Sequence, residues 1–399
     1  MKKYLFLLIL WPVFFSGCPS DSSDSDEVEL EFTTEIIFSR GDYNAVGLTF
    51  DGLATDSDNN VHIVHESDNL ELLYTTNASG EWHTIVIEVA GIEVGKYSSI
   101  AVDTQDNLHI AYFANTHYEP LGEDELLTGN LKYATNSSGT WQTFTLATGT
   151  GMTPRLCLDG SDNVHIVHSK LGASDLYSIL DINYTTNITG TWETTAIKSG
   201  TVKGTDASIA VDTNGKIHIS CRNEEGTGTS AEGGMGGLRY ITNVSGQWTW
   251  QDVDTVKTAG HDDDIVIDSG GKIHICYLDK NAGLKYATNL SGSWETVLLD
   301  GTQNVGWNTS LKADSNNHVH ISYSDPGTVL NPPGNGYLKY ITNETGSWDI
   351  TIVDTENAGY STGLTVCGDN HVHIAYYVFE AAVVRGELKY ATKPTLASP

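Results

Sequence analysis

The sequence predicts an all-β fold, a seven-bladed β-propeller with four antiparallel strands in each blade, and three observations lead to this prediction. The composition, with 40 glycines, 19 tyrosines and 9 tryptophans among 399 residues, suits short strands and tight turns better than helices. One pattern of residues recurs seven times along the chain. The strand that the last repeat lacks is found ahead of the first repeat, as a closed ring requires.

Each repeat contains four short strand-like runs, which we name A to D. Run A is of the type Ser-Ile-Ala-Val-Asp (residues 99–103), run B carries His-Ile, run C carries Tyr-x-Thr, and run D begins at a tryptophan. The histidines are His62, His109, His165, His218, His274, His320 and His373; the aspartates six residues before them are Asp56, Asp103, Asp159, Asp212, Asp268 and Asp314; the tryptophans are Trp82, Trp141, Trp192, Trp248, Trp294 and Trp348. Four strands in a repeat of about 50 residues predict a propeller blade and not a helical solenoid.

The propeller is expected to occupy residues 30–393, followed by a tail at 394–399. The seventh repeat ends after Tyr390-Ala-Thr without a tryptophan or a run D. A strand-like run at 32–38 precedes the first run A, and Phe32 stands in the place of the tryptophan. We therefore expect this N-terminal strand to complete the last blade, which would remove an open sheet edge.

The first residues are typical of an export signal. Lys2 and Lys3 precede an apolar run at residues 4–15, which is shorter than the roughly 20 residues that a membrane-spanning helix needs. Residues 15–18, Phe-Ser-Gly-Cys, resemble the lipobox of bacterial lipoproteins, in which the cysteine is acylated and becomes the mature N-terminus. This resemblance implies a lipoprotein signal peptide at 1–17 and lipidation of Cys18. An ordinary secretory signal with cleavage nearby is the alternative.

Residues 18–29 are polar and acidic, and we expect a flexible tether between the lipidated Cys18 and the propeller. Position 19 is proline and not the aspartate that favours retention at the inner membrane, so the resemblance to lipoproteins implies an exported, lipid-anchored protein at the outer membrane or cell surface. The lipid anchor is then the only membrane contact that we expect.

The histidines recur once per blade at the same point of run B, so the symmetry of a ring would keep them apart. A metal ion needs its ligands to converge within about 2.1 Å of one point, and we therefore expect no metal and no cofactor. We expect each buried imidazole to hydrogen-bond the aspartate six residues earlier, with Cys367 in its place in the seventh repeat. Cys157, Cys221 and Cys276 also fall in strand patterns, and buried unpaired thiols are expected there.

The charge balance excludes one class of partner. Lys and Arg number 21 against 51 Asp and Glu, a formal net charge of −30, and such a surface repels nucleic acid. The B–C and D–A connections vary between repeats, whereas the A–B and C–D turns are nearly constant, and variable loops on a constant scaffold are where folds carry sites.

Just ahead of the A runs, close to the expected central channel, lie the predicted ligand-binding residues. They are Tyr97, Arg155, Asp206, His261, Trp307 and Tyr360, with Phe50 in the first repeat. An aromatic-rich set with a few polar groups suits the face of a sugar or a small apolar ligand. The alternative is that some of these rings only plug the mouth of the channel.

The C–D turn carries a family resemblance. Residues 284–294, Leu-Lys-Tyr-Ala-Thr-Asn-Leu-Ser-Gly-Ser-Trp, are similar to the Asp-box of sialidase-type propellers, with Asn289 where that family has aspartate and Gly292 displaced by one residue. The Asp-box is a structural turn that occurs in enzymes and in non-enzymes. The resemblance therefore supports the fold and leaves the function open.

The leading functional hypothesis is a non-enzymatic, monomeric surface lipoprotein that binds a glycan or an envelope protein through the variable face. A sialidase-like glycoside hydrolase is one alternative. The resemblance then implies three arginines that hold the carboxylate of the sialate, and the arginines in this chain are Arg40, Arg155, Arg222, Arg239 and Arg385. The Arg-Ile/Leu-Pro motif of that family is absent, and its enzymes are six-bladed. A polysaccharide lyase with His117 or His261 as base is a second alternative. A purely structural envelope protein is the third.

Overall fold

The structure is a computed structural model that describes residues 31–39, 52–67, 70–89, 94–117, 128–171, 179–197, 204–223, 236–302, 305–327, 336–356, 358–368, 371–380 and 385–395. In these ranges it contains strands and turns and no helix, hence none long and apolar enough to cross a membrane. Apart from Glu31, the described residues belong to one unit, Phe32–Pro399.

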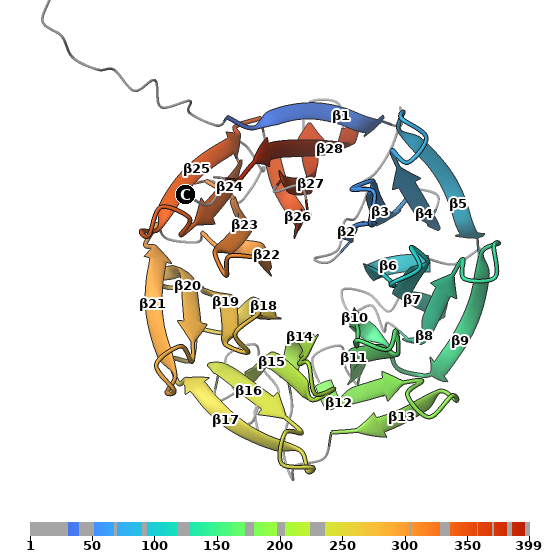
Figure 1. The fold of residues 1–399 in the computed structure, drawn as a ribbon, viewed down its shortest axis with the longest axis horizontal. Helices are drawn as coiled ribbons and strands as arrows, with labels where there is room; N and C mark the ends of the chain where they lie inside the picture. Colours follow the sequence, from blue (N-terminus) through green and yellow to red (C-terminus); the bar gives the residue numbers. More distant parts are fainter. Residues whose placement is uncertain are drawn as a thin grey trace, which may run out of the picture. The chain divides into compact units, whose positions relative to one another are not determined.

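The strands form seven antiparallel sheets of four strands each, and we number these blades 1 to 7 (Figure 1). Blade 1 contains β2 (Leu53–Thr55), β3 (Val61–Glu66), β4 (Glu71–Thr76) and β5 (His83–Val89); blade 2 contains β6 (Val94–Val102), β7 (Leu108–His117), β8 (Thr128–Thr135) and β9 (Gln142–Thr148); blade 3 contains β10 (Met152–Leu158), β11 (Val164–Leu171), β12 (Ile179–Thr186) and β13 (Glu193–Ala196). Blade 4 contains β14 (Gly204–Val211), β15 (Ile217–Asn223), β16 (Leu238–Thr242) and β17 (Thr249–Asp254); blade 5 contains β18 (His261–Ile267), β19 (Ile273–Asp279), β20 (Gly283–Thr288) and β21 (Glu295–Asp300). Blade 6 contains β22 (Trp307–Ala313), β23 (Val319–Asp325), β24 (Tyr337–Thr342) and β25 (Asp349–Asp354); blade 7 contains β26 (Ala358–Val366), β27 (His371–Glu380), β28 (Arg385–Pro394) and β1 (Thr33–Ser39).

The blades form a closed ring. The first strands of successive blades, β2, β6, β10, β14, β18, β22 and β26, contact one another in turn, and β26 contacts β2. These strands lie innermost in Figure 1, and the fourth strand of each blade lies at the rim. The predicted fold, a seven-bladed β-propeller with four antiparallel strands per blade, is confirmed.

The N-terminal strand completes the last blade, as the sequence predicts. β1 pairs antiparallel with β28, and the partners include Thr33 with Thr392 and Glu35 with Tyr390. The ring centroid of Phe32 lies 5.2 Å from that of Tyr340 in blade 6. On the other side, the Trp82 Nε1–H of blade 1 donates a hydrogen bond to Glu35 at 3.0 Å. The two ends of the chain therefore join blades 6, 7 and 1.

One aromatic contact recurs between neighbouring blades and explains the repeated tyrosines and tryptophans. The third-strand tyrosine of one blade packs against the tryptophan of the next. The pairs are Tyr74 with Trp141 at 5.3 Å, Tyr133 with Trp192 at 4.9 Å, Tyr184 with Trp248 at 5.5 Å, Tyr240 with Trp294 at 5.1 Å, Tyr286 with Trp348 at 5.1 Å and Tyr390 with Trp82 at 5.2 Å. Phe32 takes the tryptophan's role against Tyr340, because blade 7 draws its outer strand from the chain's beginning.

The C–D turns are held by an asparagine. In blade 5 the Asn289 side-chain oxygen accepts a hydrogen bond from the backbone N–H of Ile273 at 2.8 Å, and the same bond recurs in blades 1 to 6. Gly292 in that turn has a φ of 92°, a conformation that favours glycine. These asparagines are therefore structural turn residues.

The propeller's cysteines lie in different blades. Cys157 is in β10, Cys221 in β15 and Cys276 in β19, while Cys367 follows β26. Cys276 is 0% exposed and is a free thiol, and its burial raises the pKa of that thiol. A buried neutral thiol of this kind is a packing group and not a reactive one.

Candidate functional site

A belt of buried histidines lies next to the A–B turns. In blade 2, His109 Nδ1 lies 2.5 Å from the Tyr133 hydroxyl, and its Nε2 lies 3.2 Å from Asp103. The distances from Nε2 to the aspartate in blades 1 to 6 are 3.1, 3.2, 3.4, 3.6, 3.2 and 3.6 Å. In blade 7 the Cys367 Sγ lies 2.9 Å from His373 Nε2. Blades 1 to 6 thus repeat the same His–Tyr–Asp set, with Nε2 hydrogen-bonded to the aspartate in blades 1, 2 and 5, and blade 7 has cysteine in place of the aspartate.

Burial acts on four histidines of this belt. It lowers the pKa of His62, His165, His218 and His274, so these imidazoles are neutral at physiological pH. Burial alone would raise the pKa of Asp103, but hydrogen bonds from Asn107 and His109 outweigh it and lower that pKa. An imidazole hydrogen-bonded to a carboxylate satisfies two buried polar groups, which is a structural role.

A second buried set lies at the opposite ends of the strands. In blade 5, the Tyr277 hydroxyl donates to Asp254 at 2.8 Å, and the Lys285 ammonium group contacts the same carboxylate, which comes from β17 of blade 4. The equivalent sets are Tyr112 and Lys132 with Glu88, Tyr323 and Lys339 with Asp300, and Tyr376 and Lys389 with Asp354. These contacts tie each of these blades to the one before it.

Blades 1 and 3 have a histidine, His65 and His168, at the position where blades 2, 5, 6 and 7 have the tyrosine of this set. In blade 3, His168 lies between Thr150 at 3.2 Å and Thr185 at 3.0 Å. Burial lowers the pKa of His168 to about 3, and burial lowers that of His65 in blade 1 to about 4. Both imidazoles are therefore neutral in the folded protein.

These two histidines predict acid destabilisation. Because their folded pKa lies below the unfolded value of about 6.5, the unfolded chain binds more protons below that pH. The free energy of unfolding should stay level above about pH 6.5 and then fall by up to about 1.4 kcal/mol per pH unit for each such histidine. Urea unfolding of the wild type and of His168→Gln at several pH values measures this. An equal slope in both proteins would contradict the assignment to His168.

The channel-mouth residues predicted from the sequence occupy three different positions of the first strands. His261 pairs with Leu278 and Trp307 pairs with Ser324, so these two are equivalent. In blade 2 the residue at that position is Lys96, and Tyr97 follows it. Arg155 lies three positions further along β10 and is 5% exposed, so it offers little surface to a ligand.

Asp206 and Tyr360 belong to β14 and β26, but their side chains lie outside the described residues, as do Phe50, Cys18 and Arg40.

A bulge lies at the same place in these first strands. The pairing shifts register between His261 and Asp264 and between Trp307 and Ser310. Inside the bulge Tyr97, Thr153, Asp262 and Asn308 have φ values of 53°, 47°, 47° and 52°, a region that residues other than glycine rarely adopt. A bulge adds a residue to one strand and re-aims the side chains around it. Because the bulge recurs at the same distance from the belt histidine, the equivalent positions can be matched by counting back from that histidine, and the predicted set did not keep one common distance.

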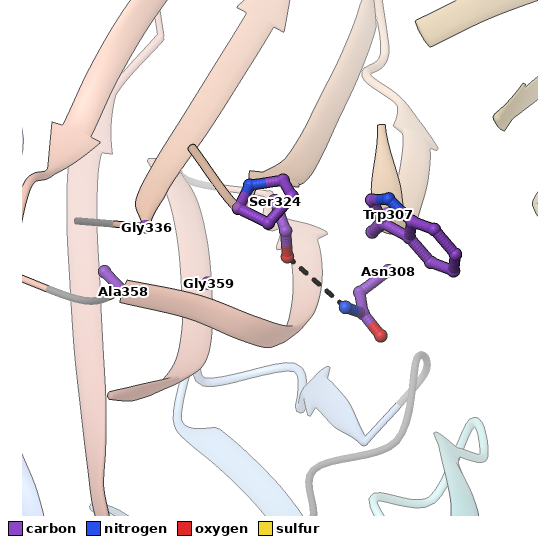
Figure 2. Close-up of a pocket in the computed structure, with 7 residues that line it drawn as sticks. Trp307, Asn308, Ser324, Gly336, Ala358 and Gly359 are labelled. Atoms are coloured by element: carbon purple, nitrogen blue, oxygen red, sulfur yellow. Dashed lines mark hydrogen bonds between the residues drawn. The ribbon is translucent and has the colours of Figure 1, made fainter. Parts of the chain in front are cut away.

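A pocket of about 270 Å³ lies between blades 6 and 7 (Figure 2). It is lined by Trp307, Asn308, Ser324, Pro326, Gly336, Ala358 and Gly359. Figure 2 shows Ala358 and Trp307 on opposite sides, and the Asn308 side-chain amide donates to the Ser324 hydroxyl at 3.4 Å. Gly359 has a φ of 85°, and a Cβ atom there would lie 3.1 Å from the carbonyl oxygen of Tyr337, so glycine lets the backbone line the pocket. At about 30 Å³ per water, the space holds roughly nine waters, which suits one sugar ring.

Trp307 lines this pocket, and its indole is also close to a cation. Its Nε1–H is shielded from solvent and has no hydrogen-bond partner among the described residues. The Lys280 ammonium group lies 5.4 Å from the centroid of the indole ring. Burial, reinforced by the charges of Arg222 and Lys280, lowers the pKa of His261 to about 3. Lys280 of blade 5 thus lies against the indole, and it also acts, together with Arg222 of blade 4, on the neutral imidazole of His261.

Lys280, Asn308, Ser324 and Pro326 were missed by reasoning from the sequence. Lys280 lies in the short connection between β19 and β20, whereas the sequence drew attention to the long connections. One signal for Asn308 was available in the sequence: Trp307 and Asn308 differ from the residues that the other repeats have just ahead of run A. In the structure Asn308 lies in the bulge and has a positive φ.

Comparison with known protein families found no match, and comparison with curated protein sequences found none. Comparison with solved structures found β-propellers. An ulvan lyase of a new polysaccharide lyase family, bound to a GlcA–Rha3S unit, matches with a TM-score of 0.59 and 10% identity over 88% of this chain and 94% of the lyase. A protein of unknown function from Dyadobacter fermentans matches with a TM-score of 0.53 and 11% identity over 75% of this chain and 94% of that chain.

A leech trans-sialidase matches with a TM-score of 0.43 and 13% identity over 90% of this chain and 70% of the enzyme. That score is too low to carry an argument, so the likeness of the C–D turn to the Asp-box stays a resemblance. At 10% and 11% identity the other two matches show the fold alone. The fold and these comparisons define the class of this protein, a seven-bladed β-propeller.

Proposed function

We propose that this protein is a surface lipoprotein that binds an acidic glycan at the pocket beside Trp307. The observation that carries the proposal is the indole of Trp307, which lines a pocket the size of one sugar ring. Aromatic rings bind the apolar face of a sugar.

The cations beside Trp307 favour a sugar with a carboxylate or sulfate group. Arg222 and Lys280 both act on His261, and Lys280 also lies over the indole. The chain as a whole has a formal net charge of −30, which disfavours anions at long range. At physiological salt, however, charges beyond about 8 Å are largely screened, so Lys280, which lies against the indole, acts on a ligand there more strongly than distant carboxylates do. The ulvan lyase with the same fold was solved with a GlcA-containing ligand, which supports this class of ligand.

A glycan array that contains neutral, uronate-bearing and sulfated sugars tests the proposal. We expect the wild type to bind acidic glycans, and Trp307→Ala to lose about 1–3 kcal/mol of binding free energy, because one stacked ring is removed. Trp250→Ala is the matched control, since Trp250 lies on the rim strand β17 and is 42% exposed. Equal binding by both variants would refute a site at Trp307.

A polysaccharide lyase remains the second candidate, and one observation favours it. His261 is neutral and stands with Arg222 and Lys280, and a lyase needs a base together with a cation that neutralises the sugar carboxylate. Incubation with the glycans found on the array, followed by ultraviolet detection of unsaturated sugar products, separates the two functions. A lyase would form such products in the wild type and lose them in His261→Ala, whereas a binding protein would form none.

The lipid anchor is part of the proposal and depends on Cys18, which lies outside the described residues. Cys18→Ser should yield a protein that is not acylated and that leaves the detergent phase in a phase-separation assay. Equal partition of the variant and the wild type would show that Cys18 does not carry the anchor.

A further inference from the structure

Three side chains at the base of blade 6 bring metal-binding atoms together. One nitrogen of His320 and one carboxylate oxygen each of Asp314 and Glu344 lie within 4.8 Å of one another. Asp314 follows β22, His320 is in β23, and Glu344 lies in the turn after β24. His320 is 0% exposed and Asp314 is 7% exposed. In the part of the chain that the structure describes, no other group of histidine, cysteine and carboxylate side chains meets this condition.

Glu344 is what distinguishes blade 6 from the other blades. The residues at its position in blades 1 to 5 are Ala78, Ser137, Ile188, Val244 and Leu290. In blade 5 the His274 Nε2 is hydrogen-bonded to Asp268 at 3.2 Å. The histidine–aspartate pair thus recurs in blades 1 to 6, whereas blade 6 alone among them has a third possible metal ligand, Glu344, beside the pair.

The histidine of blade 6 has an open nitrogen. His320 Nε2 lies 3.6 Å from Asp314 and has no hydrogen-bond partner among the described residues. The other nitrogen, Nδ1, is held by the Tyr340 hydroxyl at 2.6 Å, which fixes the plane of the ring. A second-shell bond of this kind orients a metal-binding histidine. His165 and His218 share the open geometry, but Ile188 and Val244 offer no ligand there.

We propose that Asp314, His320 and Glu344 bind one divalent transition-metal ion, and that zinc suits the set best. One imidazole nitrogen with two carboxylates matches zinc, which takes nitrogen and oxygen ligands at about 2.0–2.2 Å, while calcium and magnesium prefer oxygen alone. The sequence led us to expect no metal, because the belt histidines stand in separate blades; the ligands proposed here all come from one blade. His318, whose Nδ1 lies 3.0 Å from Asp314, stands beside the ligands.

The site is separate from the Trp307 pocket and serves stability. β22 begins at Trp307 and ends one residue before Asp314, so at about 3.3 Å per residue the two sites lie roughly 20 Å apart along the strand. The metal site instead adjoins the junction where the ring closes, because Tyr340 holds His320 and also packs against Phe32. A metal that binds only the folded ring raises its stability by mass action.

Zinc titration of the untagged, metal-free full chain tests the proposal. We expect calorimetry to show one zinc ion at this site, and zinc, more than calcium or magnesium at equal concentration, to raise the melting temperature. Glu344→Gln should weaken the site by about ten-fold or more, because it removes the charge of one ligand and keeps the shape of the side chain. Glu81→Gln is the matched control: it removes a carboxylate near the C–D turn of blade 1, where no such cluster lies among the described residues.

A wild type that binds zinc no more tightly than calcium overturns the proposal, as would unchanged zinc affinity and stoichiometry in Glu344→Gln. Weakened binding in both glutamate variants would also overturn it, because it would mean that the ion responds to net charge alone.

Discussion

Deletion of residues 30–38 is expected to unfold the propeller or to cause it to aggregate. The deletion removes most of β1, which pairs with β28 along the rim of blade 7, and so exposes a long sheet edge. It also removes Phe32 from Tyr340, Glu35 from Trp82 and Phe38 from His65. A fully buried aromatic side chain contributes about 3–5 kcal/mol; Phe32 and Phe38 are partly buried, but they are lost together with the strand, and whole domains are stable by only about 5–15 kcal/mol.

Thermal melting and light scattering measure this effect. Deletion of residues 19–29, the acidic segment that precedes the propeller, is the control and should leave the melting temperature unchanged. Phe32→Ala should give an intermediate loss, because it keeps the strand and removes the ring that replaces the tryptophan. A melting temperature that is the same with and without residues 30–38 would mean that the ring is held closed in another way.

Asp254→Ala is expected to cost about 3–5 kcal/mol of stability, because it leaves a buried ammonium group without its main partner. Lys285 contacts Asp254 directly, its other carboxylate neighbour, Asp279, is 3.9 Å away, and Tyr277 also donates to Asp254. The loss should weaken the contact between blades 4 and 5, since Asp254 belongs to β17 and both donors belong to blade 5.

Asp300→Ala provides the matched comparison. It removes the same kind of carboxylate from Lys339, but Asp325 lies 2.8 Å from that ammonium group and remains as a partner. The free energy of unfolding, measured with urea, should therefore fall less for Asp300→Ala than for Asp254→Ala. Equal losses would show that the tyrosine bond, and not the lysine, dominates these contacts.

Most of the fold could be predicted because the same pattern recurs seven times, so the strand assignment made in one repeat can be checked against the other six. Seven repeats placed the tyrosines and tryptophans at fixed intervals, and the absence of a tryptophan after Tyr390 pointed to Phe32 as its replacement. The structure then shows Phe32 against Tyr340, in the contact that tryptophans make elsewhere. The buried histidine and aspartate could also be predicted, because residues with the same structural role stand at the same position of successive repeats.

The candidate site could be predicted only in part, because it depends on departures from the repeat. Trp307 and His261 were found, since they stand just ahead of a recognisable strand. Tyr97 and Arg155 were grouped with them, although they stand at other distances from the belt histidine and therefore at other register positions. Lys280 comes from a neighbouring blade, and no sequence spacing relates it to Trp307. Glu344 was missed for a similar reason. A single glutamate in one turn indicates a metal site only when the structure places it beside a histidine from another strand.

The central claim is that the pocket beside Trp307 binds the ligand and that the histidine belt stabilises the fold. Two variants, Trp307→Ala and His218→Ala, test it when glycan binding and melting temperature are measured on both. Trp307→Ala should weaken binding of the best array ligand by roughly 5- to 150-fold, which corresponds to about 1–3 kcal/mol, with an unchanged melting temperature. His218→Ala should lower the melting temperature, because the Tyr240 hydroxyl loses its hydrogen bond and a buried side chain is removed, and should keep the affinity. Loss of binding in His218→Ala with an unchanged melt, together with full binding by Trp307→Ala, would contradict the claim.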